Sequence, residues 1–238
     1  MRLALAILIL GLSTVSSGQT LFDIEKRLKL LNNPADLVYD TTGFSKLPPF
    51  NYFCDGENQH KWDNYHIVDL NNDGVDDLIY SGPCMPYSQT GIFLNDGQKL
   101  KQIHDSPGQI VALEQSTNGT IVNILKEACC CDYFSDYIEI RIHSDCTVDK
   151  NVITFEGNTE ITLDSLQEIK ITGTLRKSPE INEIEKKDDC SEQIIRGNHL
   201  LAISKLTSVV ELTRSGNWRL VLYPEDKMQS WIGWIKDE

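Results

Sequence analysis

The sequence is short of positive charge. Against 22 Lys and Arg stand 35 Asp and Glu, which gives a formal net charge of −13 at pH 7. Such an acidic surface repels the phosphates of nucleic acids and anionic lipid headgroups, so no nucleic-acid partner is expected. It suits a protein that collects divalent cations, although solvation alone also accounts for it. With 40% hydrophobic residues, the chain can bury a core and is not a disordered tail.

Long hydrophobic runs are also scarce. The one clear apolar run, residues 3–12, follows a short positive start and precedes small residues such as Ser16 and Gly18. This layout predicts a secretory signal peptide that is cleaved before Gln19. The alternative of a membrane anchor is disfavoured, because a span needs about 20 apolar residues. No later segment is long and apolar enough, so the mature chain is expected to be periplasmic or secreted, without a transmembrane segment.

Common catalytic signatures are missing as well. The sequence has no G-x-S-x-G elbow, P-loop or H-E-x-x-H helix. Residues 188–191 (DDCS) are similar to the D-C-S-G nucleophile motif of cell-wall cysteine amidopeptidases, but Glu192 stands where that motif has Gly. A thiolate at Cys190 would need a base such as His199, and the sequence shows no third group to orient it. A non-enzymatic protein is therefore expected, with a cell-wall hydrolase or its accessory as the alternative.

The cysteines fit an oxidising compartment. Cys54 and Cys84 flank the acidic loop described below and form the first expected pair, worth roughly 3 kcal/mol by chain-entropy reasoning. The triplet at 129–131 offers partners for Cys146 and Cys190, and its geometry is poor for zinc, which favours spaced pairs. An odd total of seven leaves at least one thiol free or bonded to another molecule. The disulfide candidates are Cys54, Cys84, Cys129, Cys130, Cys131, Cys146 and Cys190.

Hydrophobic periodicity predicts a short helix near the start of the mature chain. Over residues 20–31, Leu21, Ile24, Leu28 and Leu31 fall on one helical face. We expect this face to pack on the domain that follows rather than on a partner.

Short β-prone runs fill the next hundred residues. Turn residues separate them, including Asn118-Gly119, which is typical of a hairpin. Strands at this spacing predict an antiparallel sandwich or a propeller-like sheet. The predicted strands lie at 67–68, 77–80, 91–94, 109–113, 120–125, 137–142 and 152–155.

The acidic loop at residues 69–77 carries the clearest chemistry. Its first, third and fifth residues are Asp, Asn and Asp, so their side chains can point inward together, and Gly74 permits a sharp turn. Calcium takes six to eight hard oxygen ligands, and the loop offers several, with water or another loop to complete the shell. The alternative is an acidic turn without metal. The expected ligands are Asp69, Asn71, Asp73, the main-chain oxygen of Val75, and Asp77.

Residues 67–78 (IVDLNNDGVDDL) resemble the FG-GAP/VCBS repeat of integrin-like propellers. Residues 91–97 (GIFLNDG) match the second strand and turn of that repeat, so the resemblance covers roughly residues 62–100. It implies that the five ligands just named hold calcium, which would stiffen the loop and serve no catalysis. Such propellers need several repeats, and residues 109–142 carry no aspartate loop.

The C-terminal region resembles a bacterial SH3-like domain over residues 168–238. Residues 171–179 (ITGTLRKSP) look like its opening strand, and a charged loop is expected at 180–193. The family patterns G-x-W-x-x-V and x-G-W-I occur at 216–221 and 232–235. The resemblance implies a small barrel that contacts a cell-envelope peptide or protein.

Four aromatic side chains of this region are assigned by strand alternation. Trp218 and Trp234 are expected in the barrel core, and Tyr223 and Trp231 on an exposed ligand-binding face. Further predicted strands lie at 200–203, 209–212, 218–221 and 231–235.

Together these patterns predict a mainly β protein that binds a partner. The alternative to binding is a structural or inhibitor-like envelope protein whose acidic surface caps another protein. The patterns make no prediction about the oligomeric state. The expected parts are a signal peptide (1–18), a helix and linker (19–49), an antiparallel β domain with the calcium loop (50–165) and an SH3-like domain (166–238).

Overall fold

A computed structural model describes residues 24–30, 40–42, 44–49, 64–84, 87–129, 133–157, 159, 161–164, 166–187 and 194–237. In these ranges the protein is mainly β with a short α-helix at residues 24–30, as predicted. The predicted signal peptide and its cleavage site lie outside the described residues. Within the described ranges, none of the helical structure has the length and apolar character needed to cross a bilayer.

The first sheet is a four-stranded antiparallel meander. It contains β1 (Tyr65–Val68), β2 (Asp77–Cys84), β3 (Tyr87–Asn95) and β4 (Leu100–Pro107), hydrogen-bonded in chain order. We did not predict β4, because its sequence lacks a regular alternation of apolar residues.

A second meander of the same kind follows. It contains β5 (Gln109–Ser116), β6 (Gly119–Lys126), β7 (Phe134–His143) and β8 (Val148–Glu156), again paired in chain order. The hairpin predicted around Asn118-Gly119 joins β5 to β6, where Ser116 pairs with Gly119. Gly119 has φ of 122°, a conformation that L side chains rarely adopt.

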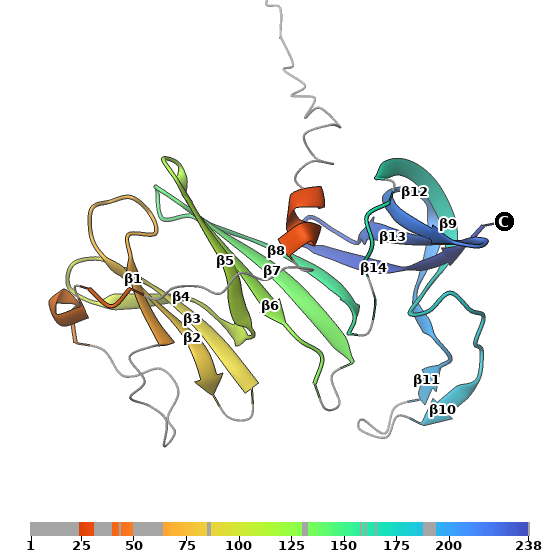
Figure 1. Ribbon diagram of the computed structural model, residues 1–238, viewed down its shortest axis with the longest axis horizontal. Helices are drawn as coiled ribbons and strands as arrows, with labels where there is room; N and C mark the ends of the chain where they lie inside the picture. Colours follow the sequence, from red (N-terminus) through yellow and green to blue (C-terminus); the bar gives the residue numbers. More distant parts are fainter. Residues whose placement is uncertain are drawn as a thin grey trace, which may run out of the picture.

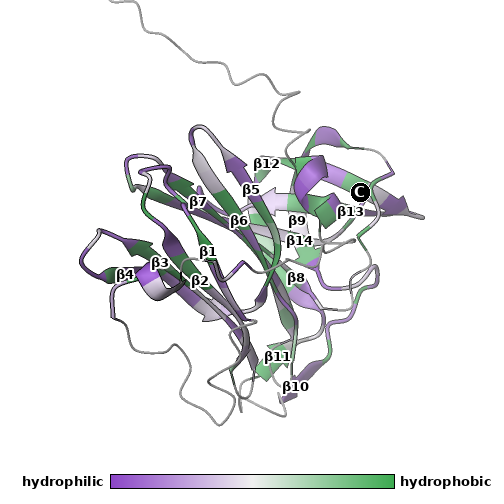
Figure 2. Ribbon diagram, turned by 60° about the vertical axis from the view of Figure 1, so that its left-hand side comes forward, coloured by the Kyte–Doolittle hydropathy of each residue, from purple (hydrophilic) through white to green (hydrophobic). Residues whose placement is uncertain are grey.

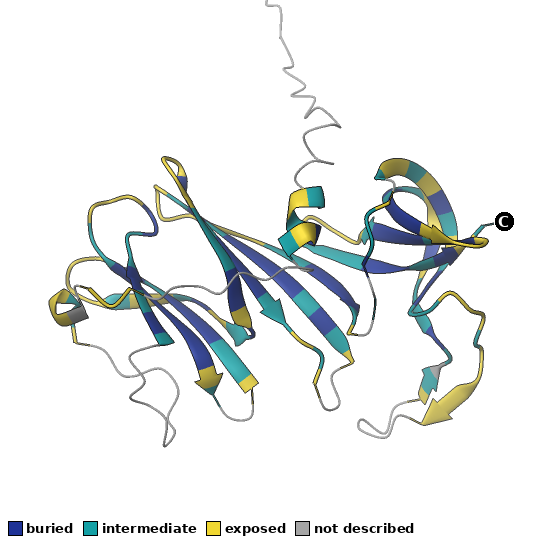
Figure 3. Ribbon diagram, in the orientation of Figure 1, coloured by how far each residue is buried: buried dark blue, intermediate teal, exposed yellow. Residues whose placement is uncertain are grey.

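The two meanders share one hydrophobic core and therefore pack against each other. Ile79 and Ile92 from the first sheet, and Ile124 and Ile142 from the second, have no exposed surface. Because alternate side chains of a strand point to opposite faces, these positions assign one face of each sheet to the shared core. Figure 2 shows hydrophobic residues along the strands of both sheets, and Figure 3 shows the same strands as largely buried. The mainly β, antiparallel architecture predicted for this part of the chain is confirmed.

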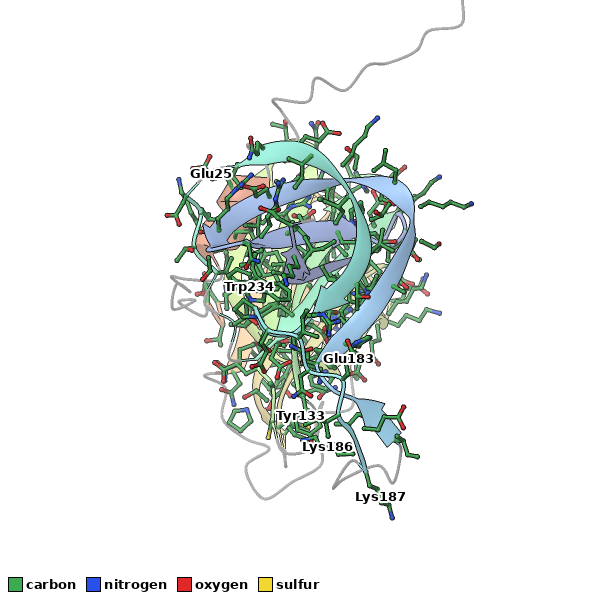
Figure 4. The ribbon with its side chains drawn as sticks, turned by 90° about the vertical axis from the view of Figure 1, so that its right-hand side faces the viewer. Glu25, Tyr133, Glu183, Lys186, Lys187 and Trp234 are labelled. Carbon is green, nitrogen blue, oxygen red and sulfur yellow. The ribbon has the colours of Figure 1, made fainter. Side chains whose placement is uncertain are left out.

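Four C-terminal strands close into a ring. They are β9 (Gln167–Arg176), β12 (His199–Ser215), β13 (Trp218–Pro224) and β14 (Gln229–Lys236). Strand β12 pairs with both β9 and β13, β13 pairs with β14, and β14 returns to β9 through Trp234 and Arg176. Figure 4 views this ring, in which register shifts let the long strand β12 bend.

The ring is continuous with the second meander. Residues 229–231 of β14 pair in parallel with residues 152–154 of β8, which joins all these strands into one eight-stranded sheet. This sheet crosses the predicted domain boundary at 165/166. Figure 1 shows the resulting order, with the first meander, the second meander and the ring side by side.

The N-terminal helix packs at the junction of the second meander and the ring. Ile24 and Leu28 are buried in a core cluster that contains residues of both, which confirms the expected packing on the chain itself. Arg27 fixes the helix through an ion pair with the buried Glu139, at 2.7 Å from Nε to Oε2. The predicted face also included Leu21 and Leu31, which lie outside the described residues.

A two-stranded arm leaves the ring between β9 and β12. Strands β10 (Glu185–Lys187) and β11 (Ile194–Arg196) pair with each other and with no other strand that the structure describes. The charged stretch 180–193 was expected to be a loop, so the prediction is wrong for β10, whose backbone groups pair with β11 despite its polar sequence. Figure 1 shows the arm projecting away from the ring.

Candidate functional site

The acidic loop is closed at its base by strand pairing. Val68 at the end of β1 is the register partner of Asp77 at the start of β2, so the two ends of the loop meet. Within it, Asn72 and Gly74 have φ of 60° and 85°, which gives the backbone its tight curvature. The loop thus brings Asp69 near Asp77, although eight positions separate them in the sequence.

The alternating side chains of the loop bind its own backbone. The carboxylate of Asp69 accepts hydrogen bonds from the amides of Asp73, at 3.2 Å, and Gly74, at 2.9 Å. The carboxylate of Asp73 accepts one from the amide of Val75 at 2.8 Å. These carboxylate oxygens stabilise the turn of the loop, and they are also atoms that could coordinate a bound cation.

Asp77 is the most unusual member of the loop because its side chain is fully buried. Its carboxylate accepts hydrogen bonds from the amides of Leu70, at 2.8 Å, and Asn95, at 2.7 Å. Burial raises the pKa of Asp77 to about 6, and the negative charges of Asp73 and Asp69 contribute in the same direction. No Lys, Arg or His of the described residues forms an ion pair with it.

The predicted ligands fit a hard cation in chemistry. Three carboxylates and the amide of Asn71 lie in one short loop, and Asp77 is desolvated without a countercharge among the described residues. In the arrangement described, no group of three or more His, Cys, Asp or Glu side chains of these residues is gathered closely enough to hold a metal ion. A calcium shell here would therefore combine carboxylates with the amide oxygen of Asn71, the carbonyl of Val75 and water.

Cys146 approaches this loop from the turn between β7 and β8. The buried Asn71 donates from Nδ2 to Asp73 Oδ2, at 2.9 Å, and to Cys146 Sγ, at 3.2 Å. Cys146 is a free, exposed thiol, so the expected disulfide with the 129–131 triplet is wrong for this residue. Its turn presents the thiol to the loop of the other sheet, a tertiary contact that the sequence does not reveal.

The other disulfide predictions are tested only in part. The described cysteines, Cys84, Cys129 and Cys146, form no disulfide with one another. Cys84 is not a free thiol. The remaining predicted positions, Cys54, Cys130, Cys131 and Cys190, lie outside the described residues.

The predicted ligand-binding aromatics lie side by side on the ring. Tyr223 of β13 and Trp231 of β14 are register partners, and both are half-buried. Trp231 donates from Nε1 to Glu225 at 2.7 Å and meets Phe134 edge-on, at 5.7 Å between ring centroids. The sequence predicted both side chains on an exposed face, but in the structure each is partly buried.

The two tryptophans predicted as core differ from each other. Trp218 is buried, as expected, with 8% of its surface exposed. Trp234 is only half-buried and lines a pocket at the edge of the ring.

For the alternative of a cysteine hydrolase, the structure places a candidate orienting group, Glu183, beside His199. His199 Nε2 lies 3.0 Å from Glu183 Oε1, which also accepts a hydrogen bond from Arg176 at 2.6 Å. The Arg176 hydrogen bond, followed by that of His199, lowers the pKa of Glu183 to about 2. Sequence reasoning missed Glu183 because it stands among many other charged residues, and Cys190 itself lies outside the described residues.

Comparison with known proteins returns no matching family model, no matching curated protein and no matching solved structure. Function is therefore inferred from the loop and the ring themselves. The resemblances to FG-GAP/VCBS repeats and SH3-like domains stay predictions from the residues quoted above.

Proposed function

We propose that this protein is an exported, non-enzymatic binding protein with a structural calcium site and an SH3-like docking module. The calcium site is the loop between β1 and β2, and the module is the ring of β9, β12, β13 and β14. The observation that carries the proposal is the fully buried carboxylate of Asp77, which shares a short loop with the carboxylates of Asp69 and Asp73 and has no basic partner among the described residues.

Calcium would supply the missing positive charge. Desolvated carboxylates are costly without a countercharge, so a divalent ion would remove a penalty that the fold otherwise bears. The residues that would hold the ion are Asp69, Asn71, Asp73, the carbonyl of Val75, and Asp77.

The acidic loop forms hydrogen bonds with residues of both sheets, so a change in its rigidity would affect both. Asp77 accepts from the amide of Asn95 at the end of β3, within the first sheet. Asn72 donates to the carbonyl of Ser116, at 2.8 Å, and Gln115 donates to the carbonyl of Asp69, at 3.1 Å. Stiffening the loop would therefore stiffen the junction between the two meanders.

Thermal unfolding of the metal-free mature chain with and without calcium tests this part. Calcium at about 100 times its Kd would add about 2.7 kcal/mol, or roughly 5–10 °C in Tm for a chain of this size. Asp77→Asn should abolish the shift, and Asp226→Asn, in an exposed turn of the ring, should retain it. An equal shift in the Asp77→Asn variant would contradict the assignment.

Docking on the ring would use the adjacent pair Tyr223 and Trp231. Aromatic side chains with an apolar body and a polar tip suit a peptide that is partly desolvated on binding. Fluorescence anisotropy of a labelled cell-wall stem peptide with the full mature chain measures this directly. Binding should weaken about tenfold in Tyr223→Ala and be unchanged in Tyr87→Ala, an exposed tyrosine of the first sheet. Equal binding by both variants would remove the docking assignment and favour a structural or inhibitor-like role.

The alternative of a cell-wall hydrolase has a separate test. Peptidoglycan digestion that is lost on Cys190→Ser would favour it, since a binding protein would lose nothing. The proposal also includes a Cys54–Cys84 disulfide beside the acidic loop, which peptide mapping without reduction would detect.

A further inference from the structure

A pocket lined mainly by polar and charged residues lies between the ring and Thr159, Thr162 and Asp164, which belong to the segment that leads from β8 toward β9. Its volume is about 580 Å³, within the roughly 300–1,000 Å³ of known ligand sites. None of its lining residues belongs to the acidic loop or to the Tyr223–Trp231 pair. It is therefore a separate candidate site.

The pocket offers hydrogen-bonding groups that the fold does not use. Oε2 of Glu156 is buried without a hydrogen-bond partner, and Nζ of Lys177 is 3.9 Å away. Thr159, Thr162 and Ser215 also line the pocket, and none of their hydroxyls has a hydrogen bond with any residue that the structure describes. A buried acceptor without a donor costs free energy, which a ligand that brings a donor would recover.

The charges of the pocket are balanced. Lys177 faces Glu156, and Arg214 binds the buried Glu211 through Nε at 2.6 Å. Asp164 accepts a hydrogen bond from the hydroxyl of Thr213, also at 2.6 Å. Because both cations are already engaged by carboxylates, the pocket does not favour a phosphate or another strong anion.

Trp234 provides an aromatic wall. It is half-buried on β14, it packs against the core cluster below the ring, and it also lines the pocket. Figure 4 labels it on the ring. An indole beside free hydroxyls offers a flat apolar face within a polar site. That combination matches a sugar, which has apolar C–H faces and a rim of hydroxyl donors and acceptors.

We propose that this pocket binds a neutral saccharide. The sugar ring stacks on Trp234, one of its hydroxyls donates to the partly exposed carboxylate of Glu156, and others bond to Thr159, Thr162 and Ser215. The proposal does not depend on calcium or on the Tyr223–Trp231 pair.

Isothermal titration of the full mature chain with chitotriose, cellotriose and maltotriose tests the proposal. At least one should bind, and Glu156→Gln and Trp234→Phe should each weaken that binding about tenfold or more. Glu156→Gln keeps the shape of the side chain, so it remains informative if Trp234→Phe perturbs folding.

A matched pair of hydroxyl deletions provides the control. Thr162→Val removes a pocket hydroxyl and should weaken binding, whereas Thr207→Val removes a hydroxyl of β12 outside the pocket and should leave it unchanged. The proposal is overturned if no trisaccharide binds, or if all variants bind equally. It is also overturned if trialanine binds with the same dependence on Glu156 and Trp234, since the site would then be a peptide site.

The titration is repeated with calcium and with EDTA. Sugar binding that persists in EDTA is expected. This result would show that sugar binding does not require calcium, so the saccharide proposal and the calcium proposal can each fail independently of the other.

Discussion

The two meanders have the same topology, but they differ in the connection between their first two strands and in their pairing with further strands. In the first, β1 and β2 are joined by the acidic loop at 69–76, and in the second the β5–β6 connection is the tight turn at 117–118. The second meander is extended by β14 into the ring, whereas the first forms no further strand pairing within the described residues. One strand order can therefore be stabilised either by neighbouring strands or, as we propose, by ion chemistry in a loop.

Their buried polar groups show the same contrast. Glu139 of the second meander is buried and meets Arg27 of the helix, so its charge is compensated within the fold. Asp77 of the first meander is buried, and among the described residues its carboxylate accepts hydrogen bonds only from two backbone amides. Between these two buried carboxylates, the one without a basic partner among the described residues lies in the predicted calcium loop.

The largest expected effect comes from the core that the meanders share. Ile79→Ala and Ile124→Ala each remove a fully buried side chain, so each should lower the free energy of unfolding by about 2–5 kcal/mol. Because both belong to one cluster, urea unfolding followed by fluorescence and by circular dichroism should stay a single transition. Ile184→Ala, on the exposed arm, should change stability by under about 0.5 kcal/mol. Two separate transitions would show that the meanders fold independently.

Each meander has a turn glycine with a positive φ, and the two glycines differ in the space available for a side chain. A Cβ on Gly119 would lie 2.0 Å from the carbonyl oxygen of Ile142, in addition to the strain of its positive φ. A Cβ on Gly97, at φ of 84°, would meet no atom within 4 Å. Gly119→Ala should therefore cost about 2–4 kcal/mol and Gly97→Ala about 1 kcal/mol, measured by the same urea titration. Equal costs would mean that the close β6–β7 approach is not fixed in solution.

The pH dependence of stability isolates the charge of Asp77. The pKa of Asp77 in the folded protein, about 6, lies above its ordinary value of 3.8. The stability that Asp77 contributes is therefore fully present below pH 3.8 and is lost as the pH rises through about 6. Without metal, wild type should lose up to ~3 kcal/mol relative to Asp77→Asn between about pH 4 and pH 7. Calcium should reduce this difference. Parallel pH profiles of the two proteins in EDTA would contradict the buried charge.

The smallest effect is expected at the base of the arm. The pKa of Glu183 is lowered from 4.5 to about 2 in the folded protein. The stability that Glu183 contributes is therefore present above pH 4.5 and is lost as the pH falls through about 2. An NMR titration of the side-chain carboxyl carbon measures this pKa. Arg176→Gln should raise the pKa of Glu183 more than His199→Gln does, because Arg176 makes the dominant hydrogen bond. A wild-type carboxyl that titrates near 4.5 would show that the network is not formed.

The sequence predicted those features that depend on local pattern. Alternating apolar residues identified most strands, and the helical face of Ile24 and Leu28 was correct. Strand β10 was missed because its three residues are all charged and exposed, so only its pairing with β11 defines it.

Features that depend on distant contacts could not be predicted. The parallel pairing of β8 with β14, the approach of Cys146 to Asn71 and the pairing of Glu183 with His199 join residues far apart in the chain. The half-burial of Trp234, which lines a pocket at the edge of the ring, also depends on tertiary packing that strand alternation does not determine.

The central claim, that the β1–β2 loop holds calcium, is tested most directly by isothermal titration. Mature chain freed of metal with EDTA and then dialysed would be titrated with calcium chloride near neutral pH. The account predicts saturable binding of one ion per chain, absent in Asp77→Asn. No heat beyond dilution in wild type, or the same isotherm in the variant, would contradict it.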